Sequence, residues 1–231
     1  KVSLLVGGGT GHEPIYHGLI GPGMADGAAC GDIFAAPPPN IILDVARAVN
    51  QGHGVLFLYG NYAGDVMNFK IAAQLAAAEG IRVETVLIWD DVASAPPSDK
   101  EGRRGIAGLI PIVKLSCSAA DKAKDLYELV SLVTLARDNT RSVGVALSPG
   151  SIPATGMPTF ELDEDSIGIG MGIHGEQGVG VEKMMTADAL ADKLVDLVLA
   201  DDLPIGSGDE VLVLINSLGS TTMMECLIVL R

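Results

Sequence analysis

The sequence lacks the marks of several protein classes. It holds only three cysteines, which lie far apart and match no metal or redox spacing, so we expect small buried thiols in the reducing cytoplasm. No run of about 18 apolar residues occurs, and no membrane span is expected. Basic residues are scarce, 15 against 29 acidic ones, which gives a net charge of −14. This balance argues against binding to nucleic acid, which needs a basic surface.

The first glycine cluster also lacks the residues of the known nucleotide-binding loops. It runs Gly7-Gly8-Gly9-Thr10-Gly11-His12-Glu13-Pro14, directly after an apolar, β-branched stretch at 2–6 that is typical of a buried strand. A P-loop needs Lys and Ser or Thr after its last glycine, and a dinucleotide fingerprint needs Gly or Ala where His12 or Pro14 stands. We therefore predict a turn that lets backbone approach a ligand, with His12 at the carboxyl end of a strand. A structural turn with a surface histidine is the alternative.

Strand and helix patterns alternate along the chain, which indicates an α/β fold. We predict two α/β domains, residues 1–140 and 141–231, with parallel or mixed sheets flanked by helices. Residues 18–31 read as a loop because they are rich in glycine and lack periodicity. Expected strands are 2–6, 54–59, 81–89, 143–147, 159–162, 166–171 and 210–216, and expected helices are 41–51, 66–79, 106–115, 120–138 and 186–200.

Both ends of the sequence suggest a longer natural chain. It begins with Lys1 rather than Met, enters a strand at once and shows no signal-peptide layout. It stops at Arg231, inside the apolar run 223–230, whereas native termini are usually polar and exposed. We expect the natural gene product to continue on both sides.

Two more polar residues stand where strands end among glycines. Asp65 follows the strand at 54–59 at the start of a helix, where its spacing favours a capping role over a carboxylate in the same crevice as His12. His174 follows the strand at 166–171 and lies between glycines. Two histidines and a carboxylate could bind a metal ion or carry out acid–base and nucleophilic chemistry, and spacing does not separate these options.

A basic pair, Arg103 and Arg104, precedes the helix expected at 106–115. Cations at a helix start oppose the helix dipole, so the position is unusual. The pair is expected either to form a solvated edge or to meet an anion.

Five segments together resemble a known family. They are Gly7 to Pro14, Asn61 to Phe69, Gly102 to Gly108, Gly170 to Glu176 and Asn216 to Gly219. In this order they resemble the substrate-binding K domain or subunit of dihydroxyacetone kinases, and the likeness covers nearly the whole chain. The resemblance implies two α/β domains with the substrate between or beside them, and a homodimer.

The same resemblance implies roles for the site residues. The Nε2 atom of His174 would add to the carbonyl of a small ketose and form a hemiaminal, which discriminates against glycerol because glycerol has no carbonyl. His12 and Asp65 would bind substrate hydroxyls, and one of them would assist removal of the proton from the attacking oxygen. This role replaces or joins the capping role of Asp65. The backbone of four further residues would line the site: Gly8, Gly9, Thr10 and Gly11.

No phosphate-donor site is visible in this sequence, and no metal or cofactor is expected on it. The resemblance implies ATP or ADP with Mg²⁺ on a separate L domain (DhaL-type), fused or as a partner subunit. In some systems a phosphotransferase-system protein rephosphorylates that nucleotide. Phosphotransfer to an alcohol group would therefore need the L partner.

One position departs from the family pattern. Gly60 stands where many members carry a lysine that contacts substrate. Without this lysine, the site would have more space and would lack a hydrogen-bond donor. Erythrulose is therefore a rival to dihydroxyacetone as the substrate. Two other functions remain open: a non-enzymatic ketose sensor that acts with a transcription regulator, and a metal-dependent hydrolase, which no ligand spacing supports.

Overall fold

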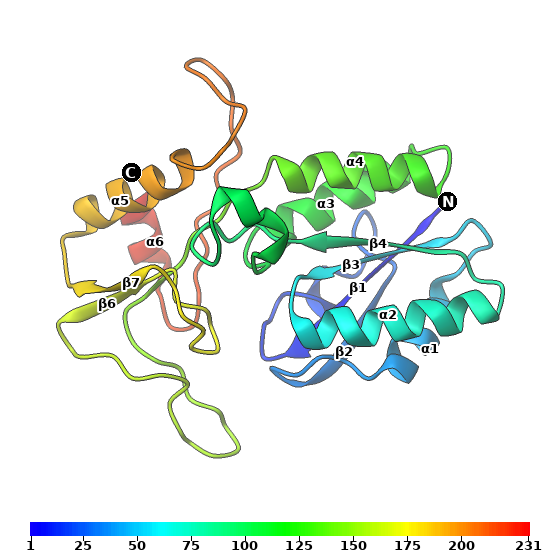
Figure 1. Cartoon of the computed structure of the whole chain (residues 1–231), viewed down its shortest axis with the longest axis horizontal. Coiled ribbons are helices and arrows are strands. Elements are labelled where there is room, and N and C mark those ends of the chain that lie inside the picture. The colour runs from blue at the N-terminus through cyan, green and yellow to red at the C-terminus, as the bar shows by residue number, and fades with distance from the viewer. The chain divides into compact units, whose positions relative to one another are not determined.

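The computed structural model describes residues 1–231 and divides into two compact units. Unit 1 contains residues 1–90 and 104–140, and unit 2 contains residues 91–103 and 141–231. Figure 1 labels most of the helices and strands of the two units. The domain division at 140/141 stays a prediction. In the structure, the segment 91–103 groups with unit 2.

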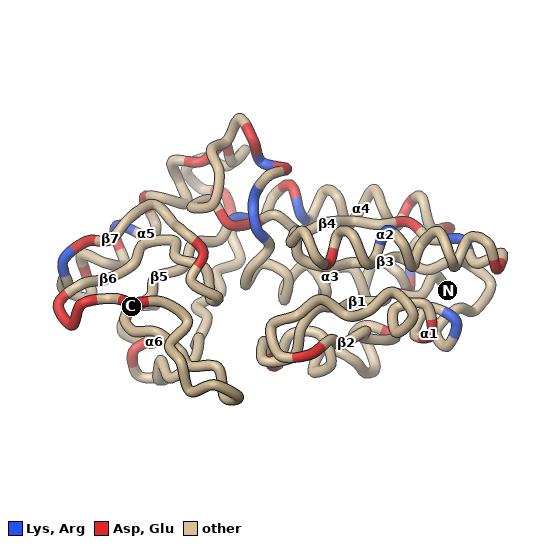
Figure 2. The backbone as a smooth tube through the Cα atoms, turned by 60° about the horizontal axis from the view of Figure 1, so that its bottom comes forward, with Lys and Arg blue, Asp and Glu red and all other residues tan.

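A four-stranded parallel sheet forms the centre of unit 1. Its strands are β1 (Ser3–Thr10), β2 (Gly27–Ile33), β3 (Val55–Gly60) and β4 (Val83–Ile88), in the order β2-β1-β3-β4. The two central strands, β1 and β3, carry no charged residue (Figure 2), and they are almost wholly buried. This pattern is typical of a parallel strand that is covered on both faces.

Helices cover both faces of this sheet (Figure 1). The helices α1 (Pro39–Val49) and α2 (Ala63–Ala78) pack with Leu5 in one apolar cluster. The helices α3 (Leu109–Ala120) and α4 (Leu126–Asp138) pack with Leu4 and Val6 in the other. Successive residues of β1 thus point to opposite faces, as the period of a strand requires. The predicted α/β class is confirmed.

Two predictions around the first glycine cluster need correction. The predicted turn forms only in the second half of the cluster, because β1 continues through Gly7, Gly8 and Gly9 to Thr10, and the chain turns from Gly11 on, where φ is +92°. The segment 18–31 is not all loop, because it contains the short helix η1 (His17–Leu19) and strand β2. Periodicity missed β2 because its glycines leave no apolar alternation, while its place in the sheet comes from backbone pairing with β1.

The glycines of β1 make room for other parts of the protein. A Cβ atom on Gly7 would lie 2.5 Å from the Ala29 carbonyl oxygen, and one on Gly8 would lie 2.2 Å from the Tyr16 ring. One on Gly9 would lie 2.6 Å from the backbone nitrogen of Ala35. Glycine inside a strand commonly marks such a close approach. Here the approaching groups belong to the chain itself.

Unit 2 contains a smaller antiparallel sheet and two α-helices. Its strands are β5 (Val145–Ala146), β6 (Ser166–Ile169) and β7 (Gly180–Lys183), and its helices are α5 (Ala187–Leu199) and α6 (Met223–Leu230). Helix α5 begins after Thr186, whose side chain caps it, close to the predicted bounds. The strands predicted at 159–162 and 210–216 are absent, because no neighbouring strand pairs with either segment.

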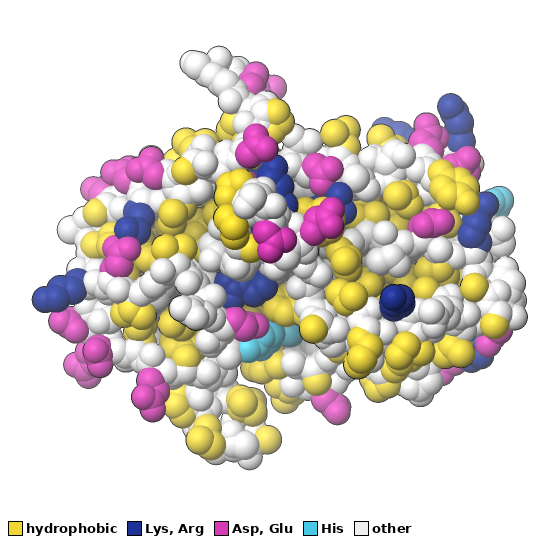
Figure 3. Space-filling model, in the orientation of Figure 1, with side chains coloured by type: hydrophobic (Ala, Val, Ile, Leu, Met, Phe, Trp, Pro, Cys, Tyr) yellow, Lys and Arg dark blue, Asp and Glu magenta, His cyan; other side chains and the backbone are white.

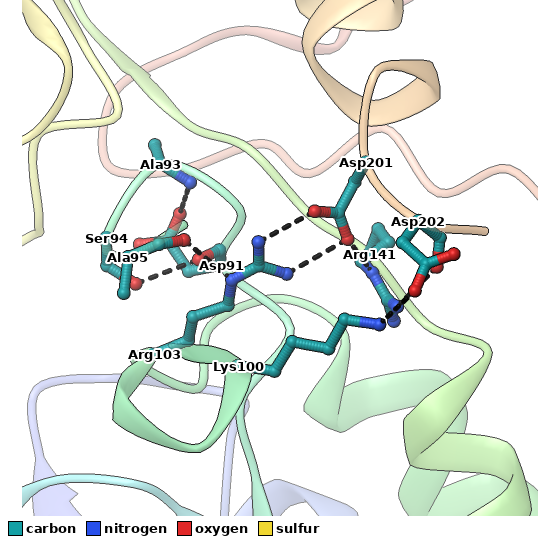
Figure 4. A network of polar contacts seen from close by, with 9 residues as sticks. All are labelled: Asp91, Ala93, Ser94, Ala95, Lys100, Arg103, Arg141, Asp201 and Asp202. Atoms are coloured by element: carbon teal, nitrogen blue, oxygen red, sulfur yellow. Dashed lines mark hydrogen bonds and ion pairs between the residues drawn. The ribbon is translucent and has the colours of Figure 1, made fainter. Parts of the chain in front are cut away.

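A buried ion-pair network fixes the segment 91–103 within unit 2 (Figure 4). The Arg103 guanidinium donates to both carboxylate oxygens of Asp201, at 3.0 and 2.7 Å, and its Nε donates to the Ala95 carbonyl at 2.8 Å. Arg141 pairs with the same carboxylate. The side chains of Arg103 and Asp201 are only 1% and 2% exposed. Arg103 therefore meets an anion, and that anion is a carboxylate of this chain.

The short helix η2 (Pro97–Gly102) lies in this segment, and its Lys100 pairs with Asp202 at 3.0 Å at the exposed rim of the network (Figure 4).

No helix in the structure is both long and apolar enough to cross a membrane. Helix α2 of unit 1 carries a stripe of exposed apolar side chains, Met67, Ile71 and Leu75, and hydrophobic side chains gather over this helix (Figure 3).

We predict that Gly7→Ala destabilises unit 1 by about 2 kcal/mol, because the new methyl group would force β2 away from β1. The clash is with the Ala29 carbonyl, which is backbone and cannot swing aside. Urea unfolding followed by the fluorescence of Trp89, the single tryptophan, measures the change. Gly180→Ala in β7 is the control, since nothing lies within 4 Å of its added Cβ, and circular dichroism should show a change below about 0.5 kcal/mol.

We predict that Asp201→Asn destabilises unit 2 by about 3 kcal/mol, because it leaves two buried guanidinium groups without their carboxylate. The hydrogen bond from Arg103 holds the pKa of Asp201 well below 3.8, and Arg141 adds to this against the opposing effect of burial. The lowered pKa contributes stability above pH 3.8 that is lost as the pH falls below it. The difference in the free energy of unfolding between wild type and Asp201→Asn should therefore be largest at neutral pH and become smaller in acid.

Hydrogen exchange of peptides from α5 measures this effect within unit 2. Asp202→Asn is the matched control, because the Asp202 side chain is 80% exposed and its pair with Lys100 should contribute less than about 1 kcal/mol. Equal exchange in both variants would show that the buried network does not stabilise unit 2.

Candidate functional site

Two predicted site residues follow the carboxyl ends of neighbouring strands in unit 1. His12 lies two residues beyond the end of β1, and Asp65 lies in the first turn of α2, shortly after the end of β3. Because β1 and β3 are paired and parallel, both segments begin at the same edge of the sheet. In open α/β sheets this edge is where ligands bind.

The His12 ring is held by the backbone of β1. Its Nδ1 atom lies 2.7 Å from the carbonyl oxygen of Gly9. A carbonyl oxygen only accepts, so Nδ1 carries the proton and Nε2 is the acceptor nitrogen of the neutral ring. The ring also contacts Phe34, with centroids 5.1 Å apart, and meets the edge of Tyr16 at 6.2 Å.

Asp65 does not cap its helix. Tyr62 occupies the N-cap position of α2, and no side chain there accepts a capping hydrogen bond. The capping role that spacing favoured is therefore wrong. The Asp65 carboxylate is buried in the first helical turn, where the helix dipole stabilises negative charge.

Sequence reasoning missed Tyr16, which lies beside His12 and interacts electrostatically with Asp65. Its ring fills the space over Gly8 and contacts His12. Its backbone φ is +73°, an unusual value for a residue other than glycine. Burial raises the pKa of the Tyr16 hydroxyl, and the negative charge of Asp65 raises it further. Tyr16 thus stays a neutral phenol next to His12. The glycine at position 8, Gly8, indicates that another group approaches the strand closely, but the sequence does not reveal which side chain this is.

The third predicted residue, His174, lies in unit 2 in the loop that follows β6. The Glu176 carboxylate contacts it twice: Oε1 lies 2.8 Å from Nδ1 of the ring, and Oε2 accepts from the His174 backbone N–H at 3.1 Å. The loop is tight, because Gly172 donates to the Glu176 carbonyl at 2.9 Å and Gly175 has a φ of +87°.

Glu176 is an ionised carboxylate at neutral pH. Burial alone would raise its pKa, but the hydrogen bonds from His174 and the backbone, with the charge interaction of the ring, outweigh burial and lower it to about 2. Glu176 belongs to the motif that carries the family resemblance, but no spacing rule singles it out.

The predicted glycines lie in two kinds of local structure, a strand and a turn. Gly8, Gly9 and Thr10 lie in β1, and Gly11 forms the turn before His12. Gly60 closes β3 and is buried. A Cβ atom there would lie 3.2 Å from the Tyr62 ring, so that ring occupies the space that was expected to be open.

No group of three or more His, Cys, Asp or Glu side chains in the structure could hold a metal ion.

Comparison with known proteins gives a consistent answer. A model of the Dak1 domain matches residues 1–231. The chain is 43% identical, over 97% of its length, to the dihydroxyacetone-binding subunit DhaK of a PTS-dependent dihydroxyacetone kinase from Listeria innocua, and covers 68% of it. It is also 43% identical, over 99% of its length, to a D-erythrulose kinase from Mycolicibacterium smegmatis, and covers 39% of it.

Two kinds of solved structure share the fold. The dihydroxyacetone kinase of C. freundii, native or with AMP-PNP and Mg²⁺, superposes with a TM-score of 0.81 at 37% identity, over 88% of this chain and 37% of that one. The dihydroxyacetone kinase operon co-activator Dha-DhaQ gives a TM-score of 0.80 at 34% identity, over 86% of this chain and 61% of that one. The chain therefore belongs to the Dak1 domain family, which confirms its resemblance to the K domains of dihydroxyacetone kinases.

Proposed function

We propose that this chain is the ketose-binding part of a dihydroxyacetone or erythrulose kinase. The observation that carries the proposal is the contact of the Glu176 carboxylate with His174. With Nδ1 donating to a carboxylate, the lone pair of the neutral imidazole lies on Nε2. That nitrogen is a nucleophile in a loop of small residues, and the carbonyl of a small ketose is a matching electrophile.

Covalent capture accounts for the selection of a ketose over a polyol. Nε2 of His174 bonds to the carbonyl carbon, and the former carbonyl oxygen becomes the hydroxyl of a hemiaminal. Glycerol has the same hydroxyls but no carbonyl, so it gains nothing from this bond. Hydrogen bonds alone give weaker discrimination between molecules of such similar size.

His12 and Asp65 are proposed to bind substrate hydroxyls. The Nε2 atom of His12 accepts a hydrogen bond in the tautomer that Gly9 imposes, and the Asp65 carboxylate accepts as well. One of them removes the proton as the hydroxyl oxygen attacks phosphorus. The backbone of Gly8, Gly9, Thr10 and Gly11 is proposed to line the same site.

The phosphoryl donor is proposed to lie on another part of the enzyme. We propose ATP or ADP with Mg²⁺ on a DhaL-type L domain or subunit, with a phosphotransferase-system protein as the alternative source of phosphoryl groups. The dependence of the Listeria relative on the phosphotransferase system supports this division. The active form is proposed to be a homodimer in the cytoplasm, where its three free thiols would stay reduced.

Erythrulose is the proposed rival substrate. It rests on Gly60, which leaves no cation at a position where many family members carry lysine, and on the relative named as a D-erythrulose kinase. The Tyr62 ring beside Gly60 offers an apolar surface and a hydroxyl instead of an ammonium group.

A second function is supported by one comparison. The operon co-activator shares this fold at 34% identity, so a ketose-sensing partner of a transcription regulator is the alternative. A sensor also needs ketone binding, so His174 does not separate the two functions. Phosphoryl transfer in the presence of the L partner does.

We predict that the full-length protein binds dihydroxyacetone but not glycerol, and that His174→Ala lowers ketone affinity at least about a hundredfold by removing the covalent bond. Titration calorimetry measures both ligands. His53→Ala, which removes an exposed histidine from unit 1, should bind like wild type. Glycerol binding as tight as ketone binding, or full affinity in His174→Ala, would leave only a polyol pocket.

We predict that erythrulose is phosphorylated with a kcat/KM at least equal to that of dihydroxyacetone when the L partner and its donor are present. Coupled assays with both erythrulose enantiomers test this expectation. Much faster turnover of dihydroxyacetone than of either enantiomer contradicts the role given to Gly60. No phosphorylation of any ketose, despite tight binding, favours the sensor.

A further inference from the structure

The carboxylate of Glu176 contacts the two groups that fix the position of His174. One oxygen accepts from the backbone N–H and the other faces Nδ1 of the ring. The Glu176 carbonyl also accepts from Gly172, so main chain and side chain of Glu176 both brace this loop. A ring held in this way keeps its plane and its tautomer before any ligand arrives.

The tautomer follows from the charge of the carboxylate. An ionised carboxylate has acceptors only, and Oε1 lies 2.8 Å from Nδ1. The other tautomer would bring two lone pairs face to face at this distance. The proton therefore lies on Nδ1, and Nε2 presents its lone pair.

His12 provides an internal comparison. Its Nδ1 atom is also bonded to an oxygen, and its tautomer is the same, but that oxygen is the neutral carbonyl of Gly9. A carbonyl orients a ring, whereas a carboxylate also stabilises a positive charge on it. The two histidines thus differ in how well they would carry the cation that forms when Nε2 makes a bond.

We propose that Glu176 is a positioning residue for ketone capture: it holds the Nδ1 proton of His174 throughout the addition, so that the bound ketose is an imidazolium hemiaminal paired with the Glu176 carboxylate. This inference rests on the proposed function and adds the state in which the substrate is held.

The step balances with one proton from water. The Nε2 lone pair forms the bond to the carbonyl carbon, and the π electrons of the C=O bond move to oxygen. That oxygen takes a proton from solvent and becomes a hydroxyl. Nδ1 keeps its own proton, so the ring gains one positive charge, and binding takes up one proton in all.

The test has two measurements on the full-length protein. Nitrogen-15 NMR of labelled histidine, without ketone, reports the tautomer of His174 in wild type, Glu176→Gln and Glu176→Ala. Calorimetry with dihydroxyacetone in two buffers of different ionisation enthalpy, at about pH 8 where an ordinary histidine is neutral, counts the protons taken up. Glu164→Gln is the control, since it removes an exposed carboxylate from the same unit.

We expect wild type and Glu164→Gln to show the Nδ1–H tautomer and to take up close to one proton per ketone. Glu176→Gln keeps an acceptor for Nδ1–H but loses the charge, so it should bind about tenfold more weakly, with proton uptake near zero. Glu176→Ala should populate both tautomers. Glu176→Gln has the shape of glutamate, which keeps the test valid if the alanine variant is unstable.

The outcomes separate this inference from the proposed function. If wild type binds the ketone covalently and Glu176→Gln matches it in affinity and proton uptake, the role of Glu176 is wrong and ketone capture stands. An Nε2–H tautomer in wild type also overturns it. If wild type forms no adduct with the ketone, the proposed function fails, and this inference fails with it.

Discussion

Unit 1 depends on the close backbone approach that its first strand permits. Without side chains on Gly7, Gly8 and Gly9, β2 pairs tightly with one edge of β1 and the Tyr16 ring settles on its surface. Any Cβ atom along this stretch would collide with a carbonyl, a ring or a neighbouring turn. The same close approach brings Tyr16 against His12, so the packing of the strand also shapes the surroundings of a site residue.

Unit 2 is held together differently. One buried carboxylate, Asp201, receives two guanidinium groups from distant parts of the sequence. The desolvation cost of these charges is high, and only mutual pairing offsets it. Segment 91–103 is thereby tied to unit 2 although the residues on both sides of it belong to unit 1. Charge pairing and backbone pairing with Ser142 both hold this segment, and hydrophobic patterns do not reveal either.

The sequence correctly predicted those strands and helices that a local pattern of residues determines. The strand at 54–59 was recognised because it is a continuous apolar run, and α5 because Thr186 caps an apolar periodic stretch. Strand β2 was missed and a strand at 210–216 was wrongly expected, because a strand exists only where another strand pairs with it. His12 and His174 could be found beside their glycines. Tyr16 and Glu176 could not, since a positive φ and a contact between residues two apart leave no periodic signal.

The two histidines show how small a structural difference could separate the two chemical roles proposed for them. Both rings are protonated at Nδ1 by the same rule, that an oxygen acceptor must face a donor. One oxygen is a neutral carbonyl fixed in a strand, which suits a ring that accepts and releases a proton. The other is a carboxylate fixed in a glycine loop, which suits a ring that must bear a charge while bonded to carbon. A Dak1 domain that had only the first kind of partner for His174 would orient the proposed nucleophile equally well but would hold the proposed cationic adduct less tightly. The charge of Glu176, more than the position of the ring, is thus the feature of unit 2 that matches the proposed covalent capture.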